Sequence, residues 1–268
     1  ASNPEFLREG AAIGDFKHPD RIVIGTDDEW ARDLMREVYR PLFLNRAPIL
    51  FTSRRSSELI KYAANAFLAV KITFINEMAD LCEKVGADVQ DVARGIGMDG
   101  RIGSKFLHAG PGYGGSGFPK DTLALLKTAE DYEAQTRIVE AVVKVNEARK
   151  RAMGRKVIEA LGGIDAARGK KAALLGLTFK PNTDDMRDAP SIAIALALAD
   201  AGVEVAAYDP EGMELAAPLM PEVAMQKSAY DAIDGADAVV IVTEWDAFRA
   251  LDFDKVKAIA GTTLGVAL

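Results

Sequence analysis

The sequence has little of what secreted, metal-dependent and nucleic-acid-binding proteins depend on. Of 268 residues, one is cysteine and two are histidine. A lone Cys82 cannot close a disulfide within the chain, which favours a reducing, cytoplasmic setting. His18 and His108 stand apart, so no metal site is expected. The formal net charge is −7, which leaves no basic surplus to neutralise the phosphates of a nucleic-acid partner.

Long hydrophobic runs are missing as well. No apolar run approaches the length of a membrane span, and no signal-peptide-like apolar region is found, so we expect no membrane partner. Hydrophobic residues make up 49% of the chain and charged residues 27%, the balance of a globular protein that can bury a core. The chain begins with alanine instead of methionine and ends on a strand-like run at 262–268. Both ends predict a fragment of a longer protein.

Glycine is concentrated in one stretch, residues 110–121, which reads GPGYGGSGFPKD. Four of its first six residues are glycine, and such a density weakens any helix or strand because glycine loses most chain entropy on folding. The stretch predicts backbone with unusual dihedral angles that a ligand can approach closely. A turn at Phe118-Pro119 is expected before the charged residues Lys120 and Asp121. A plain surface loop is the alternative for a glycine-rich run taken alone.

Strand-like and helix-like segments alternate, which predicts an α/β fold. Strands are expected at residues 21–25, 48–52, 171–176, 203–208 and 238–243, and helices at 27–43, 57–85, 122–131, 136–161 and 191–200. A further helix start is expected at Asn3, with Pro4 in its first turn. The strand–helix–strand repetition after residue 170 is typical of a doubly wound parallel sheet. No GxGxxG fingerprint follows the strand at 171–176, so NAD is not assigned to this half.

The longest periodic segment, residues 57–85, carries an apolar stripe at spacings of three and four. Its members are Ile60, Ala63, Phe67, Val70, Phe74, Met78 and Leu81. A helix of about 40 Å, at 1.5 Å per residue, usually joins two domains or forms a subunit interface. Lys61 and Asn65 lie beside this stripe, either as a functional pair or as solvated polar residues. Cys82 falls on the apolar arc, and we interpret it as a buried residue with no catalytic role.

A second group of polar residues follows the strand at 171–176. Open parallel sheets bind ligands beyond the carboxyl ends of their strands, where Lys180 is either a phosphate partner or a surface lysine. A dense charged cluster comes next, ahead of the helix expected to open at Pro190, and is either solvated or a contact between domains. Its members are Asp184, Asp185, Arg187 and Asp188.

Five motifs occur in one order along the chain: SNPEFLREGAAIGDF (2–16), PDRIVIG (19–25), ELIKYAANAFLAVKITFINE (58–77), RIGSKFLHAGPGYGGSGFPKD (101–121) and GLTFKPNTDDMRDAPS (176–191). Together they resemble the nucleotide-sugar 6-dehydrogenases of the UDP-glucose/GDP-mannose dehydrogenase family, most closely its bacterial UDP-glucose branch. The resemblance implies three regions. Residues 1–52 would close an NAD-binding Rossmann-like domain, 53–160 would form a central helical dimerisation domain with the active-site loop, and 161–268 would form a Rossmann-like UDP-sugar-binding domain.

That family oxidises the C6 alcohol of a nucleotide sugar to a carboxylate with two NAD in succession. The resemblance therefore implies UDP-glucose as substrate, UDP-glucuronate as product and a homodimer through the central helix. A non-catalytic UDP-sugar-binding or dimerisation module is the alternative from another class. The related GDP-mannose and UDP-N-acetyl-hexosamine 6-dehydrogenases are the alternatives within the family.

The resemblance also implies roles for individual residues. Lys61 and Asn65 would stabilise oxyanion character at C6, Asp121 would hold the catalytic water or Lys61, and Glu5 would act as general base. Substrate contacts are implied for Glu5, Phe6, Leu7, Lys61, Asn65, Arg101, Phe106, Tyr113, Gly114, Gly115, Phe118, Phe179 and Lys180, with Arg101 reaching the sugar of the neighbouring subunit. Cofactor contacts are implied for Glu9, Lys120 and Arg187.

Two departures from the family pattern stand out. Gly117 occupies the position of the family's catalytic cysteine, whose thiolate attacks the C6 aldehyde and leads to a thioester. The family's N-terminal fingerprint, its catalytic threonine and its C-terminal substrate-binding arginine are not matched. We therefore expect this polypeptide not to make UDP-glucuronate.

Overall fold

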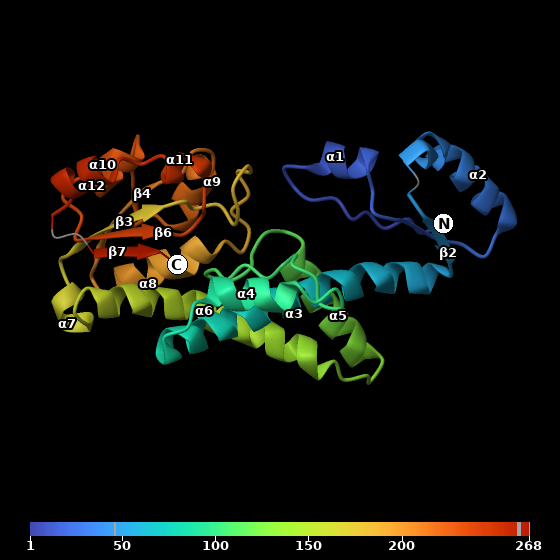
Figure 1. The fold of residues 1–268 in the computed structure, drawn as a ribbon, viewed down its shortest axis with the longest axis horizontal. Coiled ribbons are helices and arrows are strands. Elements are labelled where there is room, and N and C mark those ends of the chain that lie inside the picture. The colour runs from blue at the N-terminus through green and yellow to red at the C-terminus, as the bar shows by residue number, and fades with distance from the viewer. Residues whose placement is uncertain (46, 262–263, 268) are drawn as a thin grey trace. The chain divides into compact units, whose positions relative to one another are not determined.

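The computed structural model describes residues 1–45, 47–261 and 264–267. The chain divides into two compact units, residues 1–67 and residues 68–268, and each is described by itself (Figure 1). The longest helix, α3 (Arg54–Val85), belongs to both, since the division falls within it.

The first unit is built on two parallel strands joined by a helix. β1 (Ile22–Gly25) pairs with β2 (Ile49–Thr52), with Ile22 opposite Ile49. The connection contains α2 (Glu29–Tyr39) and the 3-10 turn η1 (Arg40–Asn45), as parallel pairing requires a crossover. A short helix, α1 (Ala12–Lys17), precedes β1. All four residues of β1 are buried, so this strand is the centre of the unit.

The helix start predicted at Asn3 is wrong. Residues 3–8 have no regular secondary structure, and Ser2 forms an antiparallel bridge with Gly25 at the end of β1. The Asn3 side chain donates to the carbonyl of Val23 at 2.8 Å and accepts from the Tyr39 hydroxyl. Asn3 therefore ties the N-terminal segment to β1 and α2 instead of capping a helix. Its partners are distant in sequence, so the local pattern around Asn3 could not predict this role.

The second unit begins with helices. After α3 come α4 (Val89–Gly97), α5 (Phe118–Asp131) and α6 (Arg137–Ala160). The predicted turn at Phe118-Pro119 is wrong, because these two residues form the first turn of α5, where proline's missing N–H costs nothing. The segments predicted as helices at 57–85, 122–131 and 136–161 are otherwise confirmed.

A five-stranded parallel sheet forms the rest of the second unit. The strand order is β5-β4-β3-β6-β7, which is the doubly wound arrangement predicted from sequence. The strands are β3 (Lys171–Leu175), β4 (Glu204–Tyr208), β5 (Ala224–Met225), β6 (Ala238–Ile241) and β7 (Leu264–Ala267). Of the strand-like run expected at 262–268, residues 262, 263 and 268 lie outside the described residues.

Helices cover both faces of this sheet (Figure 1). The main helix on one face is α8 (Pro190–Asp200), reached as predicted through Pro190. The shorter elements are α7 (Ile164–Ala167), α9 (Met213–Ala216), η2 (Ala217–Leu219), α10 (Ala229–Ile233), α11 (Asp246–Arg249) and α12 (Phe253–Ile259). None of these short elements was predicted, because three to seven residues give no readable period.

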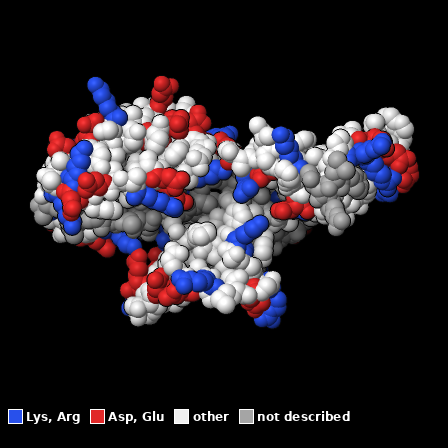
Figure 2. All heavy atoms as spheres, turned by 45° about the horizontal axis from the view of Figure 1, so that its top comes forward, with Lys and Arg blue, Asp and Glu red and all other residues white. Residues whose placement is uncertain are grey.

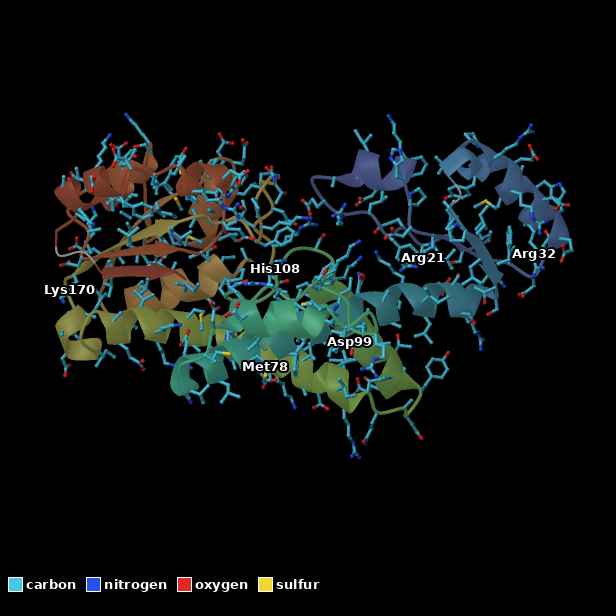
Figure 3. All side chains as sticks on the ribbon, viewed as in Figure 1. Arg21, Arg32, Met78, Asp99, His108 and Lys170 are labelled. Carbon is cyan, nitrogen blue, oxygen red and sulfur yellow. The ribbon has the colours of Figure 1, made fainter. Side chains whose placement is uncertain are left out.

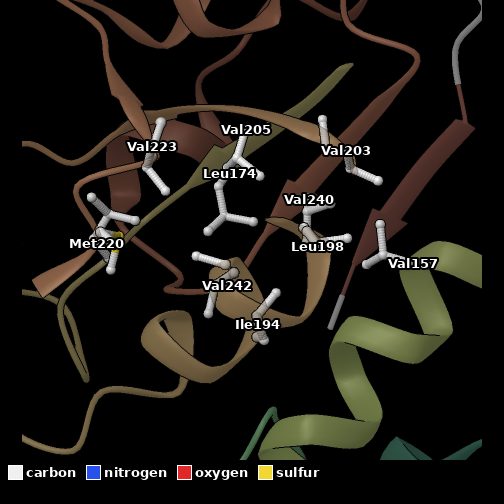
Figure 4. Packing of buried hydrophobic residues seen from close by; sticks show 14 of the residues in the cluster. Val157, Leu174, Ile194, Leu198, Val203, Val205, Met220, Val223, Val240 and Val242 are labelled. Atoms are coloured by element: carbon white, nitrogen blue, oxygen red, sulfur yellow. The ribbon is translucent and has the colours of Figure 1, made fainter. Parts of the chain in front are cut away.

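The alternation of side chains along β3 produces two cores. Ala172 and Leu174 point to the face covered by α8 and the end of α6, where Leu174, Ile194 and Val157 pack together (Figure 4). Ala173 and Leu175 point to the opposite face, against α10, α11 and α12. A strand buried on both faces is expected to be apolar throughout, which is why 171–176 could be recognised from sequence.

The surface of the chain is mixed in charge. Lysine and arginine side chains are interspersed with aspartate and glutamate on the face drawn in Figure 2. No helix in the described part of the chain has the length and apolar character needed to cross a membrane.

Candidate functional site

In the first unit, Lys61 and Glu5 are brought together. The Lys61 Nζ donates to the backbone carbonyl of Glu5 at 2.7 Å and lies 3.2 Å from the Glu5 carboxylate. The lysine side chain is mostly buried while the Glu5 side chain is 62% exposed. The Glu5 carboxylate also accepts from the Leu7 N–H at 2.6 Å. An ammonium and a carboxylate thus stand side by side, with the carboxylate accessible to a ligand or water.

Phe6 and the neighbouring residues frame this pair. The guanidinium of Arg21, a residue labelled in Figure 3, lies over the Phe6 ring, with its Cζ 4.1 Å from the ring centroid. The Lys61 Nζ lies 5.5 Å from the same centroid. Asn65 lies one helical turn beyond Lys61 on α3 and is half-buried, as is Glu9. Residues 5–9 thus pass close to the α3 turn that carries Lys61.

In the second unit, the glycine loop (residues 110–117) has no helix or strand. Gly110, Gly112 and Gly115 have the spacing of a dinucleotide fingerprint, but no strand leads into them, so the mechanism of that fingerprint does not apply. The loop instead leads into α5, with Gly117 at the N-cap position. The alternative of a plain surface loop is wrong, because Tyr113, Gly114 and Gly115 are buried.

The glycine loop packs against the segment that follows β3. The Gly115 N–H donates to the carbonyl of Arg187 at 2.7 Å. Gly115 has φ +79°, and a Cβ there would come within 2.7 Å of the Phe179 ring. The Lys180 Nζ lies 5.1 Å from the same ring. Phe179, Arg187 and the glycine loop are therefore adjacent.

Aromatic side chains surround the start of α5. Phe118 makes edge-to-face contacts with Phe106 and Tyr113, at 6.1 and 5.9 Å between centroids. Phe106 has φ +64°, an uncommon conformation for a bulky residue. Burial raises the pKa of Tyr113 to about 12, opposed in part by a hydrogen bond with Thr122. Tyr113 belongs to a small core with Ala69 and Val142.

Asp121 is the most enclosed acidic candidate. It lies in the first turn of α5, its side chain is 2% exposed, and one carboxylate oxygen is 3.5 Å from the Nζ of Lys120. Lys120 itself is exposed. A buried carboxylate four residues after Gly117 therefore points to a role inside the fold. The resemblance had implied a role for Asp121 in holding the catalytic water or Lys61, and had not implied its burial.

Two arginines expected to bind ligands are exposed and paired with aspartates. Arg101 forms a two-pronged ion pair with Asp99, and hydrogen bonds from Arg101 lower the pKa of Asp99. Arg187 pairs in the same way with buried Asp185, at 2.8 and 2.9 Å. Each guanidinium is thus oriented by a neighbouring carboxylate while most of its surface faces solvent.

Sequence reasoning missed the residues that support these groups. Asn76, Asn146 and Arg149 bond the backbone of the glycine loop. Asp209, after β4, accepts from the backbone N–H groups of Leu177 and Thr178 and from the Trp245 indole. A polar residue at helical spacing on an apolar face, such as Asn146 between Val142 and Met153, was the available signal.

No group of three or more histidine, cysteine, aspartate or glutamate residues in the described ranges is arranged to hold a metal ion. His18 and His108 are both exposed, and Cys82 is buried as predicted.

Three domain models of one family match the chain in sequence. The NAD binding domain of the UDP-glucose/GDP-mannose dehydrogenase family matches residues 1–43, its central domain matches 55–148, and its UDP binding domain matches 173–266. The matches cover both units and follow the family's domain order.

Individual relatives agree with these matches. The chain is 68% identical over its whole length to a UDP-glucose 6-dehydrogenase of Rhizobium meliloti, of which it spans 61%, and 52% identical over 91% of its length to one of Bacillus subtilis, of which it spans 54%. The chain thus spans about three-fifths of the curated relatives it matches.

Solved structures give the same answer. A UDP-glucose dehydrogenase from the hyperthermophilic archaeon Pyrobaculum islandicum superposes with a TM-score of 0.89 at 40% identity, covering 98% of this chain and 62% of that one. With the parallel sheet, the ordered domain matches and the level of identity in agreement, this chain belongs to the UDP-glucose/GDP-mannose dehydrogenase family.

Proposed function

We propose that this chain is part of an NAD-dependent UDP-glucose 6-dehydrogenase, which oxidises UDP-glucose to UDP-glucuronate. We propose further that the chain with Gly117 binds the UDP-sugar but does not complete the oxidation. The observation that carries the assignment is the 68% identity, over the whole chain, to a UDP-glucose 6-dehydrogenase. The family in general also includes enzymes for GDP-mannose, so the substrate must be tested directly.

The Lys61–Glu5 pair supports a role in the chemistry at C6. A buried ammonium can stabilise negative charge that develops on the substrate oxygen as hydride leaves, and an exposed carboxylate can take a proton from the alcohol or from water. Their 3.2 Å separation would place both groups within reach of one substrate atom. Asn65, one turn along α3, would add an amide donor. NAD, when bound, supplies the acceptor for the hydride.

The residues present fit only part of an NAD site. The turns after β1, β2 and β3 begin at Thr26, Ser53 and Gly176, and none carries the glycine fingerprint that admits a pyrophosphate. The exposed cations of Arg187 and Lys120, with Glu9, are the groups we propose for the cofactor. Arg187 suits this role because Asp185 fixes its guanidinium in one orientation.

Position 117 limits the chemistry of this chain. Gly117 is the N-cap of α5, where the helix dipole and free N–H groups would lower the pKa of a thiol. Glycine offers no nucleophile there. Cys82 cannot substitute, because it is 6% exposed and lies on α3. This observation is the reason to keep the non-catalytic UDP-sugar-binding module as a second candidate.

The division into 1–52, 53–160 and 161–268, a homodimer and a cytoplasmic location are further parts of the proposal. The exposed apolar side chains of α3 support the dimer, since Phe74 and Leu81 lie seven residues apart and are about half exposed. That spacing places them on one stripe, as in a helix that pairs with a partner.

Calorimetry tests the binding function on the chain as it is. We expect micromolar binding of UDP-glucose and at least about tenfold weaker binding of GDP-mannose. Lys180→Ala should weaken UDP-glucose binding, and Lys255→Ala, an exposed lysine on α12, serves as its control. Equal or tighter binding of GDP-mannose would overturn the substrate assignment.

Turnover separates the two candidate functions. In a chain extended to the length of its relatives, Gly117→Cys should produce two NADH for each UDP-glucose, while the Gly117 chain should not complete turnover. If the cysteine variant binds UDP-glucose yet forms no NADH, the dehydrogenase assignment fails and the binding module is favoured.

A further inference from the structure

We infer that Asn146 of α6 is a positioning residue for the glycine loop: its side-chain amide holds the loop backbone in the conformation that the loop needs to face a sugar nucleotide. The inference deepens the proposed function and rests on it. Asn146 belongs to none of the positions that the family motifs implied for substrate or cofactor.

The geometry around Asn146 is that of a two-way amide pair. Its Oδ1 accepts from the Tyr113 N–H at 2.8 Å, and its Nδ2 donates to the Tyr113 carbonyl at 3.0 Å. The side chain of Asn146 is almost fully buried. One side chain thus pairs both backbone groups of Tyr113, as a neighbouring strand would, at a place where the glycine loop has no strand beside it. Burial makes both bonds costly to lose.

Gly112 is shaped to admit this amide. Its φ is +125°, and a Cβ at this position would lie 3.0 Å from the Asn146 Oδ1. A side chain at 112 would therefore be strained in backbone and pressed against the amide oxygen. The absence of a side chain at Gly112 therefore leaves room for the Asn146 amide to reach the backbone of Tyr113.

The entrance to the loop is held by side chains in the same way. The Gly110 N–H donates to the Asn76 Oδ1 at 2.8 Å, and the Gly110 carbonyl accepts from the Arg149 Nε at 2.6 Å. Arg149 is in turn paired with Asp80 at 2.7 Å. Asn76 and Asp80 lie on α3 and Arg149 on α6, so two long helices fix where the loop begins.

The loop conformation that Asn146 holds also determines how the loop contacts the segment after β3, which carries Phe179 and Arg187. Gly115 follows Tyr113 by two residues, and its N–H bonds the Arg187 carbonyl while the Phe179 ring covers its Cα. A backbone this close to a ring tolerates little displacement. A shift at Tyr113 would therefore change how Gly115 meets Phe179 and Arg187, two of the proposed ligand-binding residues.

The test compares Asn146→Ala with Val142→Ala, one turn earlier on the same helix. Val142 packs in the Tyr113 side-chain cluster, so its truncation loosens packing around Tyr113 and leaves both amide bonds in place. Hydrogen exchange at the Tyr113 and Gly115 N–H groups is measured in both, together with UDP-glucose affinity by calorimetry. Asn146→Ala should accelerate exchange at Tyr113 and Gly115 by about tenfold or more and weaken UDP-glucose binding by a similar factor. Val142→Ala should change the affinity by less than about twofold.

A conservative variant separates positioning from folding. Asn146→Asp keeps an acceptor for the Tyr113 N–H but sets an oxygen against the Tyr113 carbonyl in place of the donor, so exchange at Tyr113 should be faster and UDP-glucose binding weaker than in the unmodified chain. If Asn146→Ala does not fold, Asn146→Asp alone decides. Exchange and affinity equal to those of the unmodified chain would overturn the inference. If the unmodified chain binds no UDP-glucose, the proposed function fails, and exchange at Tyr113 still decides whether Asn146 holds the loop.

Discussion

At the scale of single residues, Tyr113 illustrates how burial changes chemistry. Its phenol is enclosed by Phe118, Val142 and Ala69, and burial raises its pKa to about 12. In the unfolded chain the pKa of a tyrosine is about 10. The neutral phenol therefore stabilises the fold fully below pH 10, and that contribution is lost as the pH rises from about 10 to about 12.

The pH dependence can be measured with urea. We expect the urea concentration at the unfolding midpoint to decrease as the pH is raised from about 9 to about 11.5. The decrease should be smaller in Tyr113→Phe, which has no phenol to ionise. Tyr132→Phe is the matched control, since Tyr132 is exposed and its removal should leave the fall unchanged. Identical pH curves for Tyr113→Phe and the unmodified chain would contradict the assignment.

Gly115 is a position where the backbone conformation and a close neighbour both require glycine. Its φ is positive, and a Cβ at this position would lie 2.7 Å from the Phe179 ring, so Gly115→Ala should cost about 2–4 kcal/mol of unfolding free energy. Gly100→Ala, where a Cβ has nothing within 4 Å, should change it by less than about 0.5 kcal/mol. Gly115→Ala combined with Phe179→Ala should recover the part due to the clash. No recovery would mean that φ alone carries the cost.

At the scale of elements, Asp209 joins the ends of three strands. Its carboxylate accepts from Leu177 and Thr178 after β3, from Glu211 and Gly212 in its own turn, and from Trp245 after β6. The residue is buried, so these donors would be left without partners if it were removed. Asp209 thereby fixes the starting point of the segment that carries Phe179, Lys180 and Arg187.

Removing Asp209 should be severe. We expect Asp209→Ala to lower the unfolding free energy by about 3 kcal/mol or more, since several buried N–H groups lose their acceptor. Unfolding can be followed by the fluorescence of Trp245. The chain has two tryptophans, so the measurement uses a Trp30→Phe background in which Trp245 is the only one. Glu204→Gln, at the exposed start of β4, should change the value by less than about 0.5 kcal/mol. A loss below about 1 kcal/mol for Asp209→Ala would show that the hydrogen bonds to the Asp209 carboxylate are not needed for stability.

The elements also show where sequence reasoning succeeded. Strands buried on both faces, such as β3 and β6, are apolar runs bounded by glycine or polar residues, and the long helices carry a period of about 3.6. The start at Asn3 could not be read correctly, because Ser2 pairs with Gly25 across the chain. The family motifs named Glu5, Lys61 and Asp121. Asn146 is marked locally only by its helical spacing, and the roles of Asn146 and Asp209 are defined by distant partners.

At the scale of the whole molecule, the exposed face of α3 predicts association. Along the predicted stripe of this helix, Phe67, Phe74 and Leu81 are exposed, whereas the helix residues that are buried, such as Ala69, Ala79 and Cys82, are not members of that stripe. Apolar side chains of this size along one stripe mark a protein interface. We expect a homodimer of twice the 28.8 kDa chain mass.

Sedimentation can test the dimer. Phe74→Lys with Leu81→Lys should give monomers at concentrations where the unmodified chain is dimeric, because two charges cannot be buried unpaired in an apolar contact. Glu222→Lys, which changes charge on an exposed residue near the sheet, should leave the mass unchanged. A dimer that persists in the double variant would place the interface elsewhere.

The burial of Cys82 has a practical consequence for watching the glycine loop at work. Cys82 is the only thiol in the sequence and lies within the fold, whereas position 117 is only partly covered. A Gly117→Cys chain would therefore carry one readily modified sulfur, and a maleimide dye or a fluorinated tag would attach there without any need to replace the native thiol. The same variant that tests the proposed turnover would thus also make the loop directly visible to spectroscopy.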